Sequence, residues 1–193
     1  MALTDLQRDV CRLLALRRIE AGESYLAGGS TLNELLGASR LSRDLDLFHD
    51  TEAAVSLSFQ ADEALLLSAG FSVVTMREAK GFIEAEVGRN GGKARVEWSR
   101  DRAFRFFPLL EHSELGLVLH PFDLATNKVL ALVGRLEVRD WVDVIECDRR
   151  LQPFGYLAWA ACGKDPGFSP SFLVDRAARQ GRYSSTEVAE LDF

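Results

Sequence analysis

Two short segments decide the fold: YLAGGS at residues 25–30 and DLDLFH at residues 44–49. In the first, an apolar stretch is followed by two glycines and a serine, which predicts a strand, a tight turn and the start of a helix. In the second, aspartate alternates with leucine, which predicts a half-buried strand with both aspartates on one face. One helix and its connection separate the two segments, so we expect the glycine turn and the acidic strand to lie close together.

The glycine turn and the acidic strand have the residue types of a phosphate site and a metal site. Gly28 and Gly29 lack side chains, so their backbone N–H groups can approach a phosphate, and Ser30 adds a hydroxyl at a helix N-terminus. Asp44 and Asp46 offer two carboxylates, and Mg²⁺ prefers oxygen ligands together with substrate phosphates. A solvated strand face would explain an isolated Asp-x-Asp, but the alternating leucines anchor this strand in the core.

Composition is typical of one globular domain, alone or with a small helical appendage. The chain has 193 residues, of which 47% are apolar and 27% charged. No apolar run approaches the roughly 18 residues of a membrane span, and the N-terminus lacks a secretion signal, so we expect a cytoplasmic protein without a membrane partner. The net charge of −6 argues against non-specific coating of nucleic acid, which depends on basic side chains. A local basic groove remains compatible with it, formed by Arg8, Arg12, Arg17, Arg18, Arg100, Arg102 and Arg105.

Outside the two segments, hydrophobic periodicity predicts further helices and strands. Asn90-Gly91 predicts a tight hairpin within three successive antiparallel strands, and Asp123 is expected to cap a helix. Ser184 is expected to start a last short helix through a capping box. A further helix is expected to be capped by Ser171 and to end at Gly181. The other expected helices cover residues 3–21, 32–36, 52–69, 123–133, 140–151 and 154–161, and the expected strands cover 24–27, 41–50, 71–76, 82–87, 93–98 and 115–119.

These elements predict an α+β fold in two parts. A small mixed β-sheet in residues 1–120 holds the glycine turn and the acidic strand, together with the N-terminal helix. A helical C-terminal region, residues 121–193, is expected to pack on this core.

The order of the motifs resembles a known group of proteins. A Gly-Gly-Ser turn followed by an acidic pair between apolar residues is similar to the signature of polymerase-beta-type nucleotidyltransferases. More narrowly, residues 25–48 resemble the AbiEii/AbiGii toxin family of abortive-infection systems, whose later motifs are a lysine on a helix and a downstream aspartate. HPFDLATNK at residues 120–128 and RDWVD at residues 139–143 match those two motifs in order and character. The resemblance thus covers residues 20–150, approximately.

This resemblance implies a metal-dependent transfer of a nucleoside monophosphate from a nucleoside triphosphate to an acceptor hydroxyl, with Mg²⁺ or Mn²⁺ on Asp44 and Asp46. It implies that Lys128 contacts the triphosphate and that Asp143 orients it or acts in proton transfer. Arg43 is an optional second cation at the same mouth. From the residues alone, Lys128 could equally be solvated and Asp143 could equally form a structural salt bridge.

A third carboxylate is expected on a neighbouring strand. Lys93, Arg95 and Glu97 alternate with apolar residues, so Glu97 lies on the polar face of a strand that could run beside the acidic strand. We therefore expect Glu97 to be a third metal ligand. Glu84 and Glu86 are alternatives, and Glu97 could also be an ordinary exposed residue.

The resemblance extends to the acceptor. Some members of the AbiEii/AbiGii family add nucleotides to the 3′ end of tRNA and thereby stop translation, with a cognate antitoxin encoded beside them. The same is implied here, with tRNA and an antitoxin as partners. A protein or small-molecule hydroxyl would use the same catalytic residues, and a module that only binds a nucleotide or a partner is a third possibility. The intact acidic pair favours an enzyme over that third possibility.

Overall fold

The computed structural model describes residues 2–42, 44–101, 104–179 and 183–191. Seven strands form one mixed sheet in the order β3-β4-β5-β2-β1-β7-β6. The acidic strand β2 lies at its centre, antiparallel to β1 and parallel to β5. The strands are β1 (Ser24–Ala27), β2 (Asp44–His49), β3 (Ser72–Ala79), β4 (Phe82–Arg89), β5 (Gly92–Arg100), β6 (Leu110–His112) and β7 (Gly116–Val118).

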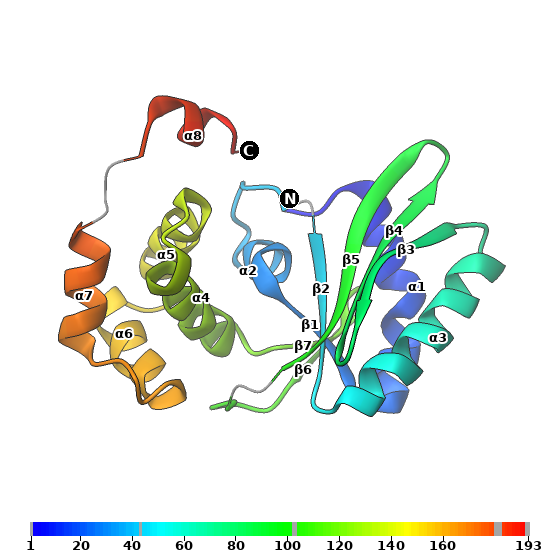
Figure 1. Cartoon of the computed structure of the whole chain (residues 1–193), viewed down its shortest axis with the longest axis horizontal. Helices are drawn as coiled ribbons and strands as arrows, with labels where there is room; N and C mark the ends of the chain where they lie inside the picture. Colours follow the sequence, from blue (N-terminus) through cyan, green and yellow to red (C-terminus); the bar gives the residue numbers. More distant parts are fainter. Residues whose placement is uncertain (1, 43, 102–103, 180–182, 192–193) are drawn as a thin grey trace.

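Helices cover the two faces of the sheet unequally (Figure 1). Two long helices pack on one face, and α2 lies on the other face beside the helical half of the chain. The part of the sheet formed by β3, β4 and β5 has helices on one face only. The helices are α1 (Asp5–Ala21), α2 (Gly28–Leu36), α3 (Glu52–Ser68), α4 (Pro121–Arg135), α5 (Val138–Arg150), α6 (Phe154–Lys164), α7 (Pro170–Arg179) and α8 (Ser185–Ala189).

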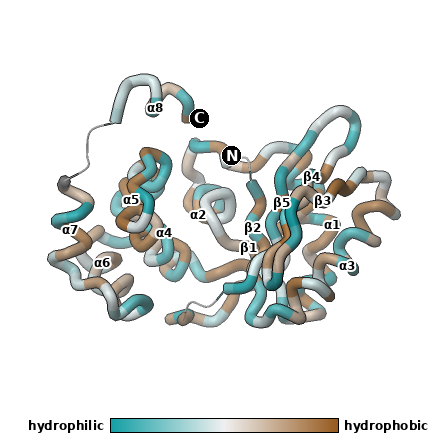
Figure 2. The backbone as a smooth tube through the Cα atoms, in the orientation of Figure 1, coloured by the Kyte–Doolittle hydropathy of each residue, from teal (hydrophilic) through white to brown (hydrophobic). Residues whose placement is uncertain are grey.

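The two faces of the sheet carry separate hydrophobic cores. Leu45 and Leu47 of β2 point into the core beneath α1 and α3, together with Trp98 of β5. Tyr25 and Ala27 of β1 belong to the second core, which the helical half completes. The alternation of hydrophobic and hydrophilic residues along β4 and β5 can be followed in Figure 2. Because successive side chains of a strand point to opposite faces, burying the leucines of β2 turns its aspartates toward the helical half.

Most of the expected elements are confirmed, including the α+β class, the helical C-terminal half and the antiparallel β3, β4 and β5. The capping box at Ser184 is also present. Strand β6 was not expected; three residues are too few to give a periodic signal. No helix within the described ranges has the length and apolar character needed to cross a membrane.

Three expectations about helix starts are wrong. Helix α7 begins at Pro170, so Ser171 lies inside the helix and is not its cap; Gly181 lies outside the described residues. Helix α2 begins at Gly28 itself, so the Gly-Gly-Ser segment forms its first turn rather than a loop before it. Helix α4 begins at Pro121 with His120 as its N-cap, so Asp123 is not the cap. The Asp123 carboxylate instead accepts hydrogen bonds from the backbone N–H groups of Phe106 and Phe107 and pairs with Lys164. This interior ion pair accounts for an aspartate that resembled a capping residue in the sequence.

Candidate active site

The glycine turn is pressed against the acidic strand. Antiparallel pairing of β1 with β2 sets Ala27 opposite Asp46, and Gly28 follows with a positive φ of 74°. A Cβ atom added to Gly28 would lie 1.7 Å from Oδ2 of Asp46. Only glycine therefore combines this left-handed backbone with so close an approach to the carboxylate. The sequence pattern suggested phosphate binding for Gly28, and the structure shows a second reason for it.

Asp46 lies among charges of both signs. Burial, together with the negative charges of Glu97 and Asp44, raises the pKa of Asp46 to about 6, although Lys128 and Arg135 oppose the shift. The parallel pairing of β2 with β5 sets Glu97 directly opposite Asp46. Burial also raises the pKa of Glu97, with Asp44 adding to the shift and Arg95 opposing it. Carboxylates that raise one another's pKa in this way are stabilised by a cation placed between them.

The donors fit a hard divalent cation in chemical type, because all three are carboxylates on one face of adjacent strands. However, both oxygens of Asp44 accept hydrogen bonds from Arg95, at 2.8 Å from Nε and 2.7 Å from Nη2. Among the described residues, no group of three or more His, Cys, Asp or Glu side chains is arranged to hold a metal ion. Glu97 therefore lies next to the aspartates without completing a ligand cluster, and its role as a third ligand stays a prediction.

Asp143 is the centre of a buried network of donors. Its side chain has no exposed surface. Arg40 donates to both of its oxygens at 2.8 Å, Asn33 Nδ2 donates to Oδ1 at 3.0 Å, and Lys128 Nζ lies 3.0 Å from Oδ2. With both oxygens engaged, Asp143 holds Arg40 and Lys128 in place, and this arrangement favours an orienting role over proton transfer.

Asp140 is a second anchor for the same cations. Arg135 donates to its two oxygens at 2.6 and 2.8 Å, and Lys128 Nζ lies 3.1 Å from Oδ1. Burial would raise the pKa of Asp140, but the hydrogen bond from Arg135 and the charges of Arg135 and Lys128 hold it below its ordinary value. The ammonium of Lys128 thus points toward the site and is not solvated, as a lone helix lysine would usually be.

The acidic pair and the cations that Asp140 and Asp143 hold line a small cavity at the N-terminus of α2, with a volume of about 140 Å³. A second cavity, of about 210 Å³, adjoins it between the glycine turn and α4. Backbone N–H groups at a helix N-terminus together with several cations form a site for a polyanion such as a triphosphate. The smaller cavity is lined by Gly29, Arg40, Asp44, Asp46, Arg95, Glu97, Lys128, Arg135 and Arg139.

The structure brings together most of the expected site residues. Gly28, Gly29, Asp44, Asp46 and Lys128 line the two cavities, and Asp143 lies directly behind Lys128. Ser30 is fully buried and lines neither cavity. We expected its hydroxyl to face a bound phosphate, and the structure places it elsewhere. Arg43 lies outside the described residues.

Four charged residues of the site were not expected from the sequence: Arg40, Arg135, Asp140 and Arg139. Arg139 and Asp140 lie within the motif at residues 139–143, and Arg135 lies between the two later motifs, so their place in the sequence was the available signal. Arg40 lies four residues before Asp44, but no periodic pattern marks it. It lies in the connection between α2 and β2, and it reaches Asp143, 103 residues away.

The expected basic groove stays a prediction. Six of its seven arginines are described, and each is already engaged. Arg18 is buried and donates to the carbonyl oxygen of Leu115, and Arg102 lies outside the described residues. The other five form ion pairs: Arg8 with Glu34, Arg12 with Glu114, Arg17 with Asp62, Arg100 with Glu52 and Arg105 with Asp50.

Comparison with known proteins gives fold-level relatives only. No family model matches the chain, and no curated protein matches it by sequence. Among solved structures, a protein from H. pylori named as a candidate nucleotidyltransferase superposes with a TM-score of 0.57 at 15% identity, covering 97% of this chain and 84% of that chain. JHP933 from Helicobacter pylori gives a TM-score of 0.54 at 15% identity, over 90% of this chain and 86% of that chain.

A third similar structure is MenT4, a nucleotidyltransferase toxin from Mycobacterium tuberculosis H37Rv. It gives a TM-score of 0.53 at 17% identity and covers 95% of this chain and 84% of that chain. At these identities the likeness concerns the fold, and the narrower resemblance to AbiEii/AbiGii toxins stays a prediction. Nearly the whole length of this chain therefore adopts the fold of nucleotidyltransferases.

Proposed function

We propose that this protein is a metal-dependent nucleotidyltransferase that moves a nucleoside monophosphate from a nucleoside triphosphate to an acceptor hydroxyl. The observation that carries the proposal is that the acidic pair and the cation cluster line one and the same cavity. Asp46 lies against Gly28, while Lys128, Arg40 and Arg135 line the adjoining cavity. Transfer from a triphosphate needs cations around the β- and γ-phosphates and carboxylates that can hold a divalent metal ion beside the α-phosphate, and this site offers both residue types.

The residues of the chain divide the work of the transfer. Asp44 and Asp46 would hold Mg²⁺ or Mn²⁺, which when bound would stabilise the attacking and leaving oxygens. The N-terminus of α2 and the three cations bind the pyrophosphate portion and stabilise its charge as it leaves. Asp143 and Asp140 fix the directions of those cations, so little reorganisation is needed when the substrate binds.

The acceptor we propose first is the 3′ end of tRNA, with the protein acting as the toxin of a toxin–antitoxin pair and an antitoxin encoded nearby. This proposal is supported by the sequence resemblance and by the likeness of the fold to MenT4, a toxin by name. The second candidate is a protein or small-molecule hydroxyl. The net charge of −6 favours it, because an acidic protein repels a long polyanion such as tRNA.

The test is transfer of label from each α-labelled nucleoside triphosphate in the presence of Mg²⁺ or Mn²⁺ and total tRNA, followed by a denaturing gel. Asp46→Asn is expected to abolish labelling. Asp175→Asn, which removes an exposed carboxylate from α7, is expected to leave it unchanged. Label on tRNA supports the first acceptor, and label on protein or a small molecule supports the second. No label with any nucleotide, from a folded protein that binds triphosphate, would contradict the proposal and favour a binding module.

A further inference from the structure

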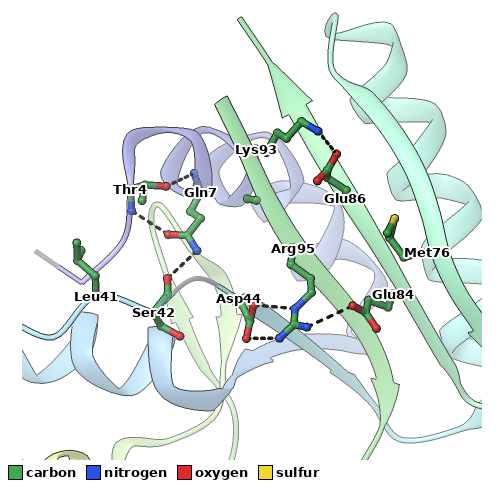
Figure 3. Close-up of a pocket in the computed structure, with 11 residues that line it drawn as sticks. Thr4, Gln7, Leu41, Ser42, Asp44, Met76, Glu84, Glu86, Lys93 and Arg95 are labelled. Carbon is green, nitrogen blue, oxygen red and sulfur yellow. Dashed lines mark hydrogen bonds and ion pairs between the residues drawn. The ribbon is translucent and has the colours of Figure 1, made fainter. Parts of the chain in front are cut away.

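Arg95 occupies the middle of an acidic cluster formed by three neighbouring strands (Figure 3). Its guanidinium makes a two-fold hydrogen bond to Asp44, at 2.8 and 2.7 Å. Glu84 lies 3.4 Å away and Glu97 lies 3.7 Å away. A side-chain cation is therefore placed where the carboxylates would otherwise repel one another.

Strand register determines this position. The parallel pairing of β2 with β5 sets Arg95 directly opposite Asp44, and the antiparallel pairing of β4 with β5 brings Glu84 opposite Glu97, one residue pair further along the same face. Because the guanidinium is planar and forked, it engages both oxygens of Asp44 at once. While this pair persists, each oxygen of Asp44 already accepts a hydrogen bond, and a positive charge lies where an incoming metal ion would approach.

The ion pair is nevertheless easy to open. The side chain of Arg95 is 48% exposed, and ion pairs in contact with water contribute little net stability. A cavity of about 410 Å³ adjoins it on the open face of the sheet, with Glu84, Glu86 and Met76 in its wall. The guanidinium thus has room to move, and a second carboxylate, Glu84, to move toward.

From this geometry we propose that Arg95 is a positioning residue that competes with the divalent metal ion for Asp44. It keeps the acidic cluster neutralised before the metal binds, and it turns toward Glu84 when the metal displaces it. The inference rests on the proposed function, since it takes Asp44 as a metal ligand. It predicts that Arg95 lowers the affinity for the metal, the opposite of what a residue that merely organised the carboxylates would do.

The test is a calorimetric titration with Mn²⁺ in the absence of nucleotide, on the wild-type protein, Arg95→Gln and Lys93→Gln. Lys93 is a matched control, because it lies on the same face of β5 two residues away and pairs with Glu86 at 2.6 Å. Both variants lose one positive charge, so a general electrostatic effect would appear in both. We expect Arg95→Gln to bind Mn²⁺ at least about fivefold more tightly than wild type, with Lys93→Gln within about twofold of it.

A double variant tests whether the gain in Mn²⁺ affinity arises at Asp44. Asp44→Asn added to Arg95→Gln is expected to remove the increase in affinity, because the oxygen pair that Arg95 released is then no longer charged. Arg95→Lys keeps the charge but loses the forked geometry, and it is expected to give a smaller gain; it serves as the second measurement if Arg95→Gln does not fold.

Three results would overturn the inference. The folded Arg95 variants could bind Mn²⁺ no more tightly than wild type, or the Arg95 and Lys93 variants could gain equally in affinity. The third result is that none of the proteins binds Mn²⁺. The outcome is separable from that of the proposed function, because no nucleotide is present. Label transfer by the wild-type protein combined with unchanged metal affinity in Arg95→Gln would refute only the role of Arg95. Label transfer that survives in Asp46→Asn would refute the catalytic assignment itself.

Discussion

The substitution Gly28→Ala tests whether the glycine turn is required for its backbone conformation or for its closeness to the carboxylate. The added Cβ would lie 1.7 Å from Oδ2 of Asp46, whereas real Cβ contacts are almost never shorter than 3.0 Å. The carboxylate must therefore move by at least 1.3 Å, the difference between these two distances. A misplacement of about 1 Å at a reacting centre can lower a rate by about 100-fold.

Gly37→Ala separates the two effects. Gly37 has a φ of 62°, close to the 74° of Gly28, but nothing lies within 4 Å of the position of its Cβ. Both variants should lose about 1–2 kcal/mol of the free energy of unfolding, the approximate energy of a left-handed backbone in a residue with a side chain. Only Gly28→Ala should also lose activity, by about 100-fold, with Gly37→Ala within about twofold of wild type.

The measurements are urea denaturation for stability and the initial rate of label transfer for activity. Equal activities for the two alanine variants would refute the reasoning, because they would show that Asp46 tolerates the displacement or is not needed. Loss of Mn²⁺ binding by Gly28→Ala, with retention by Gly37→Ala, would trace the lost activity to the carboxylate.

Three further predictions concern the buried charges. Asp143→Asn should lower the free energy of unfolding by about 3 kcal/mol or more, because Arg40 and Lys128 lose their buried counter-charge; urea denaturation measures it. Lys164→Met should lower it by about 3 kcal/mol, since Lys164 lies 2.8 Å from the fully buried Asp123; hydrogen exchange should show faster opening of the segment that Asp123 holds. Burial keeps the pKa of His49 below its ordinary 6.5, so the unfolded chain binds a proton that the folded chain does not. Stability should therefore fall from about pH 7.5 to 5.5, and less steeply in His49→Asn.

The prediction for Asp143 has a matched control variant, and each of the three predictions has an outcome that would contradict it. Glu146→Gln, on the same helix as Asp143, should change the free energy of unfolding by less than about 1 kcal/mol, because its partner Arg150 is half-exposed. A similar loss in both variants of α5 would argue against a central role for Asp143. Unchanged hydrogen exchange in Lys164→Met would show that the segment is held by other contacts, and parallel pH profiles for wild type and His49→Asn would show that His49 is not the source of the acid sensitivity.

The features that the sequence predicted well are those with local signals. The alternation in β2 required only that its leucines be buried, and this alone places Asp44 and Asp46 on one face. The succession of β1 and α2 follows from an apolar stretch that ends in two glycines. The pattern of its own helix does not show whether Lys128 points toward solvent or toward the site. That prediction depended on the resemblance to a family with a lysine at that position.

The features that the sequence did not predict depend on contacts between distant segments. Arg40 follows no periodic pattern, and its partner Asp143 becomes evident only when α2 packs against α5. The pair between Arg95 and Asp44 depends on a parallel register, and α3, β3 and β4 all lie between its two strands in the sequence. Asp123 has the features of a capping residue until the position of Lys164 is known.

The wide spacing of the site along the chain has a consequence for its synthesis. The acidic strand and the glycine turn lie in the first quarter of the sequence, whereas Asp140 and Asp143, which hold the cations, lie in α5. Proteins emerge from the ribosome N-terminus first, and early segments begin to fold before late ones exist. A nascent chain, or a product of premature termination before α5, thus carries the carboxylates without anchored cations. We expect the protein to become able to catalyse the proposed transfer only late in translation, once α5 has been made.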